Sequence, residues 1–540
     1  MATIEIERQH QLPADEALRR SKLMIDELSR REGLQARWDD ARCHIKGTSL
    51  TGHVQVEAQR IVVAIDLGLP MRPFTPFVRN MVQGGIDRAL AEPAPLPAVP
   101  HGAPAAQATS PSLPSAPDAA EAKGDASLLA PGPLGPVRAA LAQFVPGRSL
   151  PQALYLAPDA FAQEMASLFR QQWQFVDHGS RLPAAGDWIT HRIGNAGIIV
   201  LRGRDGVVRA FHNVCPHRGS TLCQAERGHS NSIVCPYHSW RFNLEGQLVH
   251  ARAMGEDFNP TDHGLRPLQV KVLEEMIYVA LADGTRAADS FERGAQFLQQ
   301  LYRLHGLARA RVAQRQVWKV KANWKLVSEN FLECYHCTPT HPEYCSVNSH
   351  AAGNSSGQPA ALSAYQELTA QWTEAQAAAG RLHGWHDFAQ AGEQALVVYR
   401  QPIREGYATL SQDGKPLAPL MGEFDRHDGG ESVVALGSTH FVSAASDHAT
   451  VFRFTPIDCD HTEVVVSWLV DQDAVEGRDY DPERLRWMWQ VTTEQDKLLA
   501  ERNHEGVRSP AYRPGPYSNV EAPLLRFTAR YVQAMREGLQ

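Results

Sequence analysis

Alternation of apolar and polar residues predicts a group of short strands near the beginning of the chain. Ile4 and Ile6 share one face of a strand over residues 3–7, and a helical pattern follows over residues 13–31. Four further strands are predicted at residues 36–38, 44–46, 54–56 and 60–66, and a last helix at about residues 74–90. The order β-α-β-β-β-β-α indicates a compact α+β domain within residues 1–92.

The next segment breaks this pattern, and a second pattern begins after it. Residues 93–136 are rich in Pro, Ala and Ser and show no periodicity, which is typical of a flexible linker. Strand–turn–strand patterns cover residues 197–208 and 240–249. Other predicted elements are helices at about residues 159–173 and 482–503, and strands at residues 450–454 and 463–470.

Composition narrows the class of protein. The chain has 540 residues, of which 43% are hydrophobic and 21% are charged, so it can form several cores. The net charge of −7 and the lack of a long basic run argue against nucleic acid as a partner. The eight cysteines do not indicate a disulfide scaffold in a chain of this length.

No targeting or membrane segment is expected. The first twelve residues contain no apolar stretch of the kind found in a signal peptide. No apolar run approaches the roughly 20 residues that span a bilayer. We therefore expect a cytoplasmic protein that does not bind to a membrane.

The most informative motif is C-x-H-x17-C-x2-H, formed by Cys215, His217, Cys235 and His238. Two thiolates and two imidazoles suit a [2Fe–2S] cluster with the cysteines on one iron and the histidines on the other. Such ligation raises the reduction potential from about −400 mV to between about −150 and +300 mV. The alternative is a tetrahedral zinc site, although zinc sites usually pair C-x2-C with H-x3-5-H.

A second motif can supply a catalytic metal. His336 and His341 form H-x4-H, and two imidazoles with one carboxylate bind Fe(II) and leave positions open for O2. Pro339 predicts that a helix ends near Cys337, so that His341 turns back toward His336. The alternative is that these are surface or packing histidines.

The residues around both motifs resemble one family. C-P-H-R-G-S at residues 215–220 and C-P-Y-H-S-W at residues 235–240 resemble the oxygenase branch of Rieske proteins. Respiratory Rieske proteins have an extra cysteine in each loop, where this chain has Ser220 and Tyr237. Residues 323–344 resemble the mononuclear-iron helix of Rieske non-heme oxygenase α subunits.

The resemblance covers residues 137–540 and implies an α+β multidomain fold. It predicts an entry segment (137–185), a Rieske β domain (186–284), and a catalytic domain (285–540) whose antiparallel sheet grips helices. It also implies a [2Fe–2S] cluster on the Cys–His motif and mononuclear Fe(II) on His336 and His341.

The same resemblance suggests two carboxylates. The residues around Asp496 resemble the C-terminal signature of betaine-type demethylating oxygenases, in which the Asp is the third iron ligand. Glu494 would face the opposite side of the predicted helix, and Asp496 could instead be an exposed helix charge. Glu333 matches the family's acid that bridges an iron ligand, here His336, to a Rieske histidine, here the partner subunit's His238. Its alternative is a solvated helix face.

The resemblance implies an oxygenase component that uses O2 to hydroxylate a C–H bond of a small molecule. Electrons from NAD(P)H would come from a separate flavin/iron–sulfur reductase, because no G-x-G-x-x-G fingerprint opens a βαβ unit. A homotrimer is implied as well. Glu at position 333 resembles the branch acting on carnitine, choline and glycine betaine, so N-demethylation of a quaternary ammonium compound is the leading hypothesis. The alternative is an aromatic-ring-hydroxylating dioxygenase.

A quaternary ammonium substrate calls for an aromatic cage. The candidates for its walls, any of which could instead be core residues, are Trp372, Trp385, Tyr399, Tyr407 and Phe441.

The first domain resembles polyhydroxyalkanoic acid system proteins over most of its length. The residues that carry this resemblance include His10, Leu12, Pro13, Ala17, Gly52, Val54 and Val56. We find no catalytic constellation there. The expectation is a docking or oligomerising appendage, with contact to a polymer granule or a protein.

Overall fold

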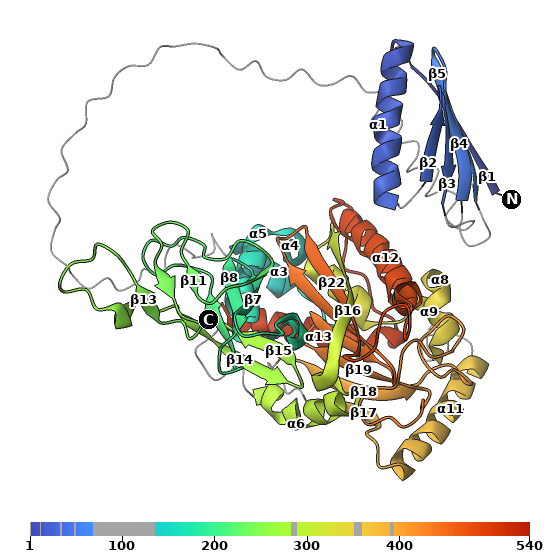
Figure 1. Cartoon of the computed structure of the whole chain (residues 1–540). Helices are drawn as coiled ribbons and strands as arrows, with labels where there is room; N and C mark the ends of the chain where they lie inside the picture. Colours follow the sequence, from blue (N-terminus) through green and yellow to red (C-terminus); the bar gives the residue numbers. More distant parts are fainter. Residues whose placement is uncertain are drawn as a thin grey trace, which may run out of the picture. The chain divides into compact units, whose positions relative to one another are not determined.

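The computed structural model describes residues 2–10, 12–32, 35–47, 50–67, 135–281, 289–349, 359–388 and 394–539. The chain divides into two units, residues 1–121 and 122–540, and each is described by itself (Figure 1). Within the described residues no helix is long and apolar enough to cross a membrane.

The first unit is an antiparallel sheet with one helix. Its sheet has the order β1-β5-β4-β3-β2. Its core consists of Ile6, Val54, Ile61 and Val63 from the strands and Ile25 from the helix. The five predicted strands and the first helix are confirmed, whereas the helix predicted at residues 74–90 lies outside the described residues. The elements are β1 (Ala2–Gln9), α1 (Ala14–Glu32), β2 (Gln35–Asp39), β3 (Arg42–Lys46), β4 (Leu50–Val56) and β5 (Arg60–Leu67).

The second unit begins with short helices, and the third of them is continued by two turns that are not α-helical. A continuous helix over residues 159–173 was expected, but α5 ends at Gln163 and is followed by a π-helical turn, Glu164–Leu168, and a 3₁₀ turn, Phe169–Gln171. The buried Glu164 carboxylate explains the change, since it accepts hydrogen bonds from side chains far along the chain. The preceding helices are α3 (Gly135–Gln143), α4 (Gln152–Leu156) and α5 (Pro158–Gln163).

Two sheets form the part with the Cys–His motif. The larger has the order β10-β7-β8-β9-β14-β15-β6, and the smaller has the order β11-β12-β13. Both predicted hairpins are present, because β8 pairs with β9 and β12 pairs with β13. The strands are β6 (Gln174–His178), β7 (Asp187–Ile193), β8 (Ala196–Arg202), β9 (Val208–His212), β10 (Arg227–His229), β11 (Ile233–Val234), β12 (Arg241–Phe242), β13 (Leu248–His250), β14 (Pro267–Leu273) and β15 (Met276–Ala280).

The remainder is one seven-stranded antiparallel sheet with helices, as expected for the catalytic domain. Its order is β16-β22-β21-β20-β19-β18-β17, and α12 packs on α7, α9 and β16 (Figure 1). The strands are β16 (Ala310–Val320), β17 (Gly384–Asp387), β18 (Leu396–Pro402), β19 (Gly430–Leu436), β20 (His440–Ala444), β21 (Ala449–Pro456) and β22 (Thr462–Asp471). The helices are α6 (Asp289–Leu304), α7 (Trp324–Leu332), α8 (Cys337–Thr340), α9 (Pro342–Val347), α11 (Pro359–Ala378), α12 (Pro482–Val507) and α13 (Ala522–Glu537).

The predicted strands at residues 450–454 and 463–470 are the centres of β21 and β22, which pair along their length. The predicted C-terminal helix is α12, which starts where Pro482 follows an Asp481 cap. The Asp481 carboxylate accepts hydrogen bonds from the backbone N–H groups of Glu483 and Arg484. The boundaries proposed for the domains stay predictions.

Candidate metal centres

The two loops that carry the Cys–His motif have the same backbone construction. The N–H of Cys215 donates to the carbonyl of Ser220 at 2.8 Å, and the N–H of Cys235 donates to the carbonyl of Trp240 at 2.8 Å. Each loop is therefore a closed turn that begins at a cysteine and brings the following histidine back beside it.

Each turn also needs one residue in the left-handed region. Gly219 has φ 73° and Ser239 has φ 60°, and their N–H groups donate to the carbonyls of Cys215 and Cys235 at 2.9 and 3.0 Å. Glycine adopts this conformation without steric cost, whereas serine does so only with strain.

The four side chains of the motif converge at the tips of these loops. Cys215 and Cys235 are buried, and their thiol groups contact one another. The rings of His217 and His238 have centroids 4.8 Å apart. His217 stacks on the buried Trp240 at 4.7 Å, which fixes the plane of the imidazole. The loops thus present two thiols side by side and two imidazoles side by side.

This arrangement fits a two-iron cluster better than a single zinc ion. The Nδ1 atom of His238 is buried and has no hydrogen-bond partner among the described residues, as expected for an atom that binds a metal. The two thiols contact one another and the two imidazoles lie side by side, so each pair can bind one iron of a two-iron cluster.

The second motif lies where a helix ends earlier than expected. The spacing predicted a helix to near Cys337, but α7 ends at Leu332, and Glu333 is extended with φ −134° and ψ 166°. His336 then precedes the short helix α8, and His341 follows it as the residue before α9. The helix interruption predicted from Pro339 is therefore right in kind, but the longer helix was wrong.

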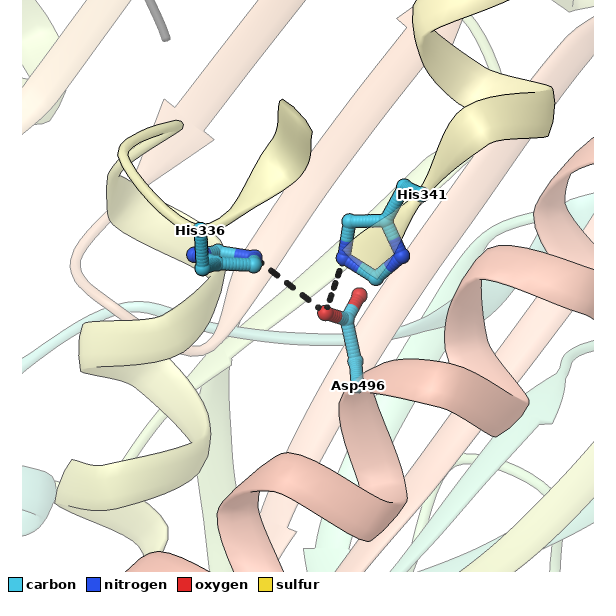
Figure 2. A group of neighbouring side chains, drawn as sticks. All are labelled: His336, His341 and Asp496. Carbon is cyan, nitrogen blue, oxygen red and sulfur yellow. Dashed lines mark ion pairs between the residues drawn. The ribbon is translucent and has the colours of Figure 1, made fainter. Parts of the chain in front are cut away.

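The short helix brings the two histidines together beside α12. The Nε2 atoms of His336 and His341 lie 3.4 and 2.9 Å from Oδ1 of Asp496 (Figure 2). The two imidazole centroids are 5.1 Å apart. These three residues are the one group of His, Cys, Asp and Glu in the described residues whose ligand atoms lie within 4.8 Å of one another. Glu494 has its carboxylate elsewhere, where it accepts a hydrogen bond from Gln490 at 3.2 Å.

The opposite ring nitrogens of the histidines are held by the protein. Nδ1 of His336 lies 2.5 Å from Oε1 of Glu333, and Nδ1 of His341 lies 2.7 Å from Oε1 of Gln495. The Gln495 amide in turn donates to Glu343 at 3.0 Å. Each imidazole therefore directs Nε2 to the same point, which is the usual construction of a histidine metal site.

Two residues that contact this three-residue group were not assigned a role from the amino-acid sequence. The Asn330 amide donates to Oδ1 of Asp496 at 2.6 Å, and Gln495 orients His341 as described above. Gln495 stands next to Asp496 in the sequence, but no spacing rule distinguishes it from the other polar residues of α12.

The charge on Asp496 suits a metal ligand. Burial alone would raise its pKa, but hydrogen bonds from His336 and His341 lower the pKa to about 2. The carboxylate is therefore ionised at neutral pH, as metal binding requires.

A cavity of about 500 Å³ opens beside these three residues. Its walls are mainly apolar and aromatic, which is typical of a site for a small ligand. Of the five aromatic candidates, Trp385, Tyr399 and Phe441 line it, whereas Trp372 and Tyr407 do not. Aromatic residues that line it without having been predicted are Phe169, Trp324, Phe331, Tyr344, Phe452, Trp489, Phe527 and Tyr531.

Three parts of the chain match known protein families. Residues 172–274 match the Rieske [2Fe–2S] domain, and residues 307–537 match the catalytic domain of ring-hydroxylating α subunits. Residues 4–91 match the polyhydroxyalkanoic acid system proteins.

Curated relatives cover the second unit. The glycine betaine monooxygenase oxygenase subunit of Chromohalobacter salexigens is 38% identical over 418 residues, which is 75% of this chain and 91% of the relative. The protein of the same description from Pseudomonas aeruginosa is 36% identical over 414 residues, 75% of this chain and 94% of the relative. The carnitine monooxygenase oxygenase subunit of Escherichia coli is 36% identical over 200 residues, 36% of this chain and 53% of the relative.

Solved structures share the fold. A quaternary ammonium Rieske monooxygenase bound to an inhibitor superposes with a TM-score of 0.56 at 22% identity, covering 73% of this chain and 97% of that one. A naphthalene 1,2-dioxygenase from Rhodococcus gives a TM-score of 0.52 at 20% identity, covering 74% and 98%.

Proposed function

The chain belongs to the Rieske non-heme iron oxygenase α subunits, and on that premise we propose that it demethylates a small quaternary ammonium compound. The observation that carries the proposal is the position of His336, His341 and Asp496 on the wall of a cavity lined with aromatic rings. Aromatic faces attract quaternary ammonium groups. The named substrates of the relatives, glycine betaine and carnitine, belong to the same chemical class.

In this proposal Cys215, His217, Cys235 and His238 hold the [2Fe–2S] cluster, and His336, His341 and Asp496 hold the mononuclear iron. When bound, these groups supply electron transfer and O2 activation. The proposed net reaction inserts one oxygen atom of O2 into an N-methyl C–H bond. It consumes two electrons and two protons and releases the other oxygen atom as water. The resulting N-hydroxymethyl group then leaves as formaldehyde and its hydroxyl proton goes to solvent, while the C–N electron pair stays on the nitrogen as a tertiary amine forms.

The chain's own residues set the geometry of this chemistry. Glu333 and Gln495 hold the two Nδ1 atoms, so that both Nε2 atoms converge on Asp496. Asn330 holds the Asp496 carboxylate from the other side. The apolar walls of the cavity exclude water from the reacting methyl group.

Electrons are proposed to come from a separate reductase and to cross between subunits of a homotrimer, from the partner subunit's His238 through Glu333 to His336. Each end of this route lies at the surface of the chain. Tyr237, which stacks on His238 at 3.8 Å, is 54% exposed, and Tyr335, next to His336, is also 54% exposed. Exposed aromatic side chains beside both centres suit a subunit interface. Inter-subunit electron transfer is described for one structural neighbour, a quaternary ammonium Rieske monooxygenase.

The N-terminal unit is proposed as a docking appendage, with a polymer granule or a protein as its partner. Its described residues contain no group of metal-ligating side chains. The support for the granule is the match of residues 4–91 to the polyhydroxyalkanoic acid system proteins.

We expect purified protein with a surrogate reductase to release formaldehyde from glycine betaine or carnitine, in proportion to the O2 consumed. The control substrates are benzoate and indole, which test the ring-hydroxylating alternative. A cis-diol or phenol product from an aromatic substrate, without formaldehyde from any quaternary amine, would overturn the demethylase proposal.

We expect Cys215→Ser and His238→Ala to lose the visible absorbance of the Rieske cluster together with turnover. Each removes one of the four ligands that converge at the loop tips, and neither contacts the second metal centre. Absorption spectra and iron content of the purified variants measure this. Cys223→Ser is the matched control, because Cys223 is buried in the same core but lies outside the motif. An unchanged spectrum in both ligand variants would contradict the assignment.

A further inference from the structure

One face of the sheet forms a wall of the cavity, and it contains a single charged residue. The wall residues alternate along three neighbouring strands, as side chains on one face of a sheet must. The alternating residues are Val397 and Tyr399 on β18, Glu431, Val433 and Ala435 on β19, and Phe441 and Ser443 on β20, where Val442 between them also lines the cavity. Glu431 is only 1% exposed.

The Glu431 carboxylate is held by neutral donors. Oε1 accepts from the Ser443 hydroxyl at 2.6 Å, and Oε2 accepts from the amides of Asn348 at 2.8 Å and Gln401 at 3.1 Å. Burial raises the pKa of Glu431, and the three donors directed at both oxygens oppose that rise because they stabilise the ionised carboxylate. Along the described segments, no lysine or arginine nitrogen lies within 4.0 Å of this group.

Two buried carboxylates in the loops next to β19 and β20 have a basic partner. Asp428 pairs with Arg400 at 2.7 Å, and Asp447 pairs with His448 at 2.7 Å. His448 acts electrostatically on Glu431, but its ring is held by Asp447. A buried charge without a partner is costly, so a carboxylate built into a cavity wall in this way is suited to a cation from outside.

Aromatic rings surround the space in front of Glu431. Trp385 stacks on Tyr399 with centroids 4.7 Å apart, and Tyr344 packs on Trp489 at 5.3 Å. Burial, and after it the charge of Glu431, raises the pKa of both Tyr344 and Tyr399, so each ring lies within the field of this carboxylate. Tyr344 lies in α9, which begins directly after His341. The carboxylate and the three proposed iron ligands thus line the same cavity.

We propose that Glu431 is the counter-charge for the substrate's ammonium group and sets the enzyme's preference for a cation over an uncharged molecule of the same shape. The inference rests on the proposed function and adds a specificity-determining residue to it. Arg526 and Arg530 also line the cavity, from α13, and Arg530 pairs with Asp387 at 3.5 Å.

The test compares two ligands of equal shape on the protein with both metal centres loaded. Glycine betaine is compared with 3,3-dimethylbutanoate, in which a neutral carbon replaces the ammonium nitrogen. Calorimetry gives the dissociation constant of each. We expect Glu431→Gln to reduce the preference for betaine by about 30-fold or more. Loss of one partner of a buried charge pair costs about 2 kcal/mol or more of binding free energy, and each 1.36 kcal/mol changes the dissociation constant about tenfold.

Two further variants separate charge from folding. Glu431→Asp keeps the charge but withdraws it by one methylene, so we expect an intermediate preference. It provides the test by itself if Glu431→Gln does not fold, which the visible spectrum of the cluster reports. Asp447→Asn is the matched control, because it removes a buried carboxylate, in the turn between β20 and β21, that does not line the cavity. We expect it to reduce stability but to keep the preference.

The outcomes distinguish this inference from the proposed function. If the wild-type protein demethylates betaine and Glu431→Gln keeps the full preference, the role of Glu431 is overturned and the proposed function stands. If Glu431→Gln does not fold, a full preference in Glu431→Asp overturns that role instead. If the wild-type protein neither binds nor demethylates any quaternary amine, the proposed function is overturned and the inference with it.

Discussion

Asp496→Ala is expected to abolish turnover while the visible absorbance of the Rieske cluster remains. Among the described residues, Asp496 is the one carboxylate that meets both Nε2 atoms, at 3.4 Å from His336 and 2.9 Å from His341. Without it, two neutral imidazoles remain, and neither neutralises the charge of the metal. Loss of residues that only support a ligand costs about 10- to 100-fold. We therefore expect more than about 100-fold loss from removal of a proposed ligand.

The measurement is mononuclear iron content, determined by metal analysis after the cluster iron has been subtracted, together with formaldehyde release. His336→Ala and His341→Ala should give the same result. Glu494→Ala is the control, since this acid lies two residues away on α12 with its carboxylate directed to Gln490. Full iron and normal turnover in Asp496→Ala would show that the third ligand lies elsewhere, and loss of iron in Glu494→Ala would then identify Glu494 as that ligand.

Glu333→Gln is expected to keep both metal centres and to slow electron transfer between them steeply. Glu333 contacts Nδ1 of His336 through Oε1 and accepts the backbone N–H of Tyr335 through Oε2, so it is outside the three-residue ligand group. Glutamine keeps the size of the side chain but removes the charge and one of the two acceptor oxygens. The proposed route through the partner subunit's His238 needs the negative charge and both acceptor oxygens.

Single-turnover oxidation of the reduced cluster, with substrate and O2 present, measures this effect. Metal analysis must first show that the variant is fully loaded. The same exchange at Glu494 removes an equal charge near the site without touching His336, and we expect a wild-type rate there. A wild-type rate in fully loaded Glu333→Gln would mean that this carboxylate only supports the loop, and that the proposed route between subunits is wrong.

Much of the fold could be predicted because its periodicities are local. The strands at residues 450–454 and 463–470 are short runs rich in β-branched and aromatic residues, and they became β21 and β22 with only longer ends. The helix over residues 159–173 failed for a tertiary reason. Glu164 accepts hydrogen bonds from Trp324, Lys325 and Tyr531, and these three donors draw the chain into a π-helical turn.

The chemistry that each loop can offer is encoded locally in the amino-acid sequence. The spacings Cys215-x-His217 and Cys235-x2-His238 place a thiol and an imidazole within one tight turn, whose closing hydrogen bonds are local. Short-range steric rules suffice for these turns. They do not suffice at the second motif, where the helix ends at Leu332 and Pro339 lies inside α8.

Tertiary packing, in contrast, selects which distant residues meet. Helix α7 ends at Leu332, so Glu333 reaches His336 from extended backbone rather than from one helical face. Gln495 and Asn330 contact the site because α12 packs on α9 and α7. Glu431 meets Ser443 and Gln401 because the register of three strands aligns them on one face. Such contacts depend on packing between elements, and local periodicity carries no information about which elements pack together.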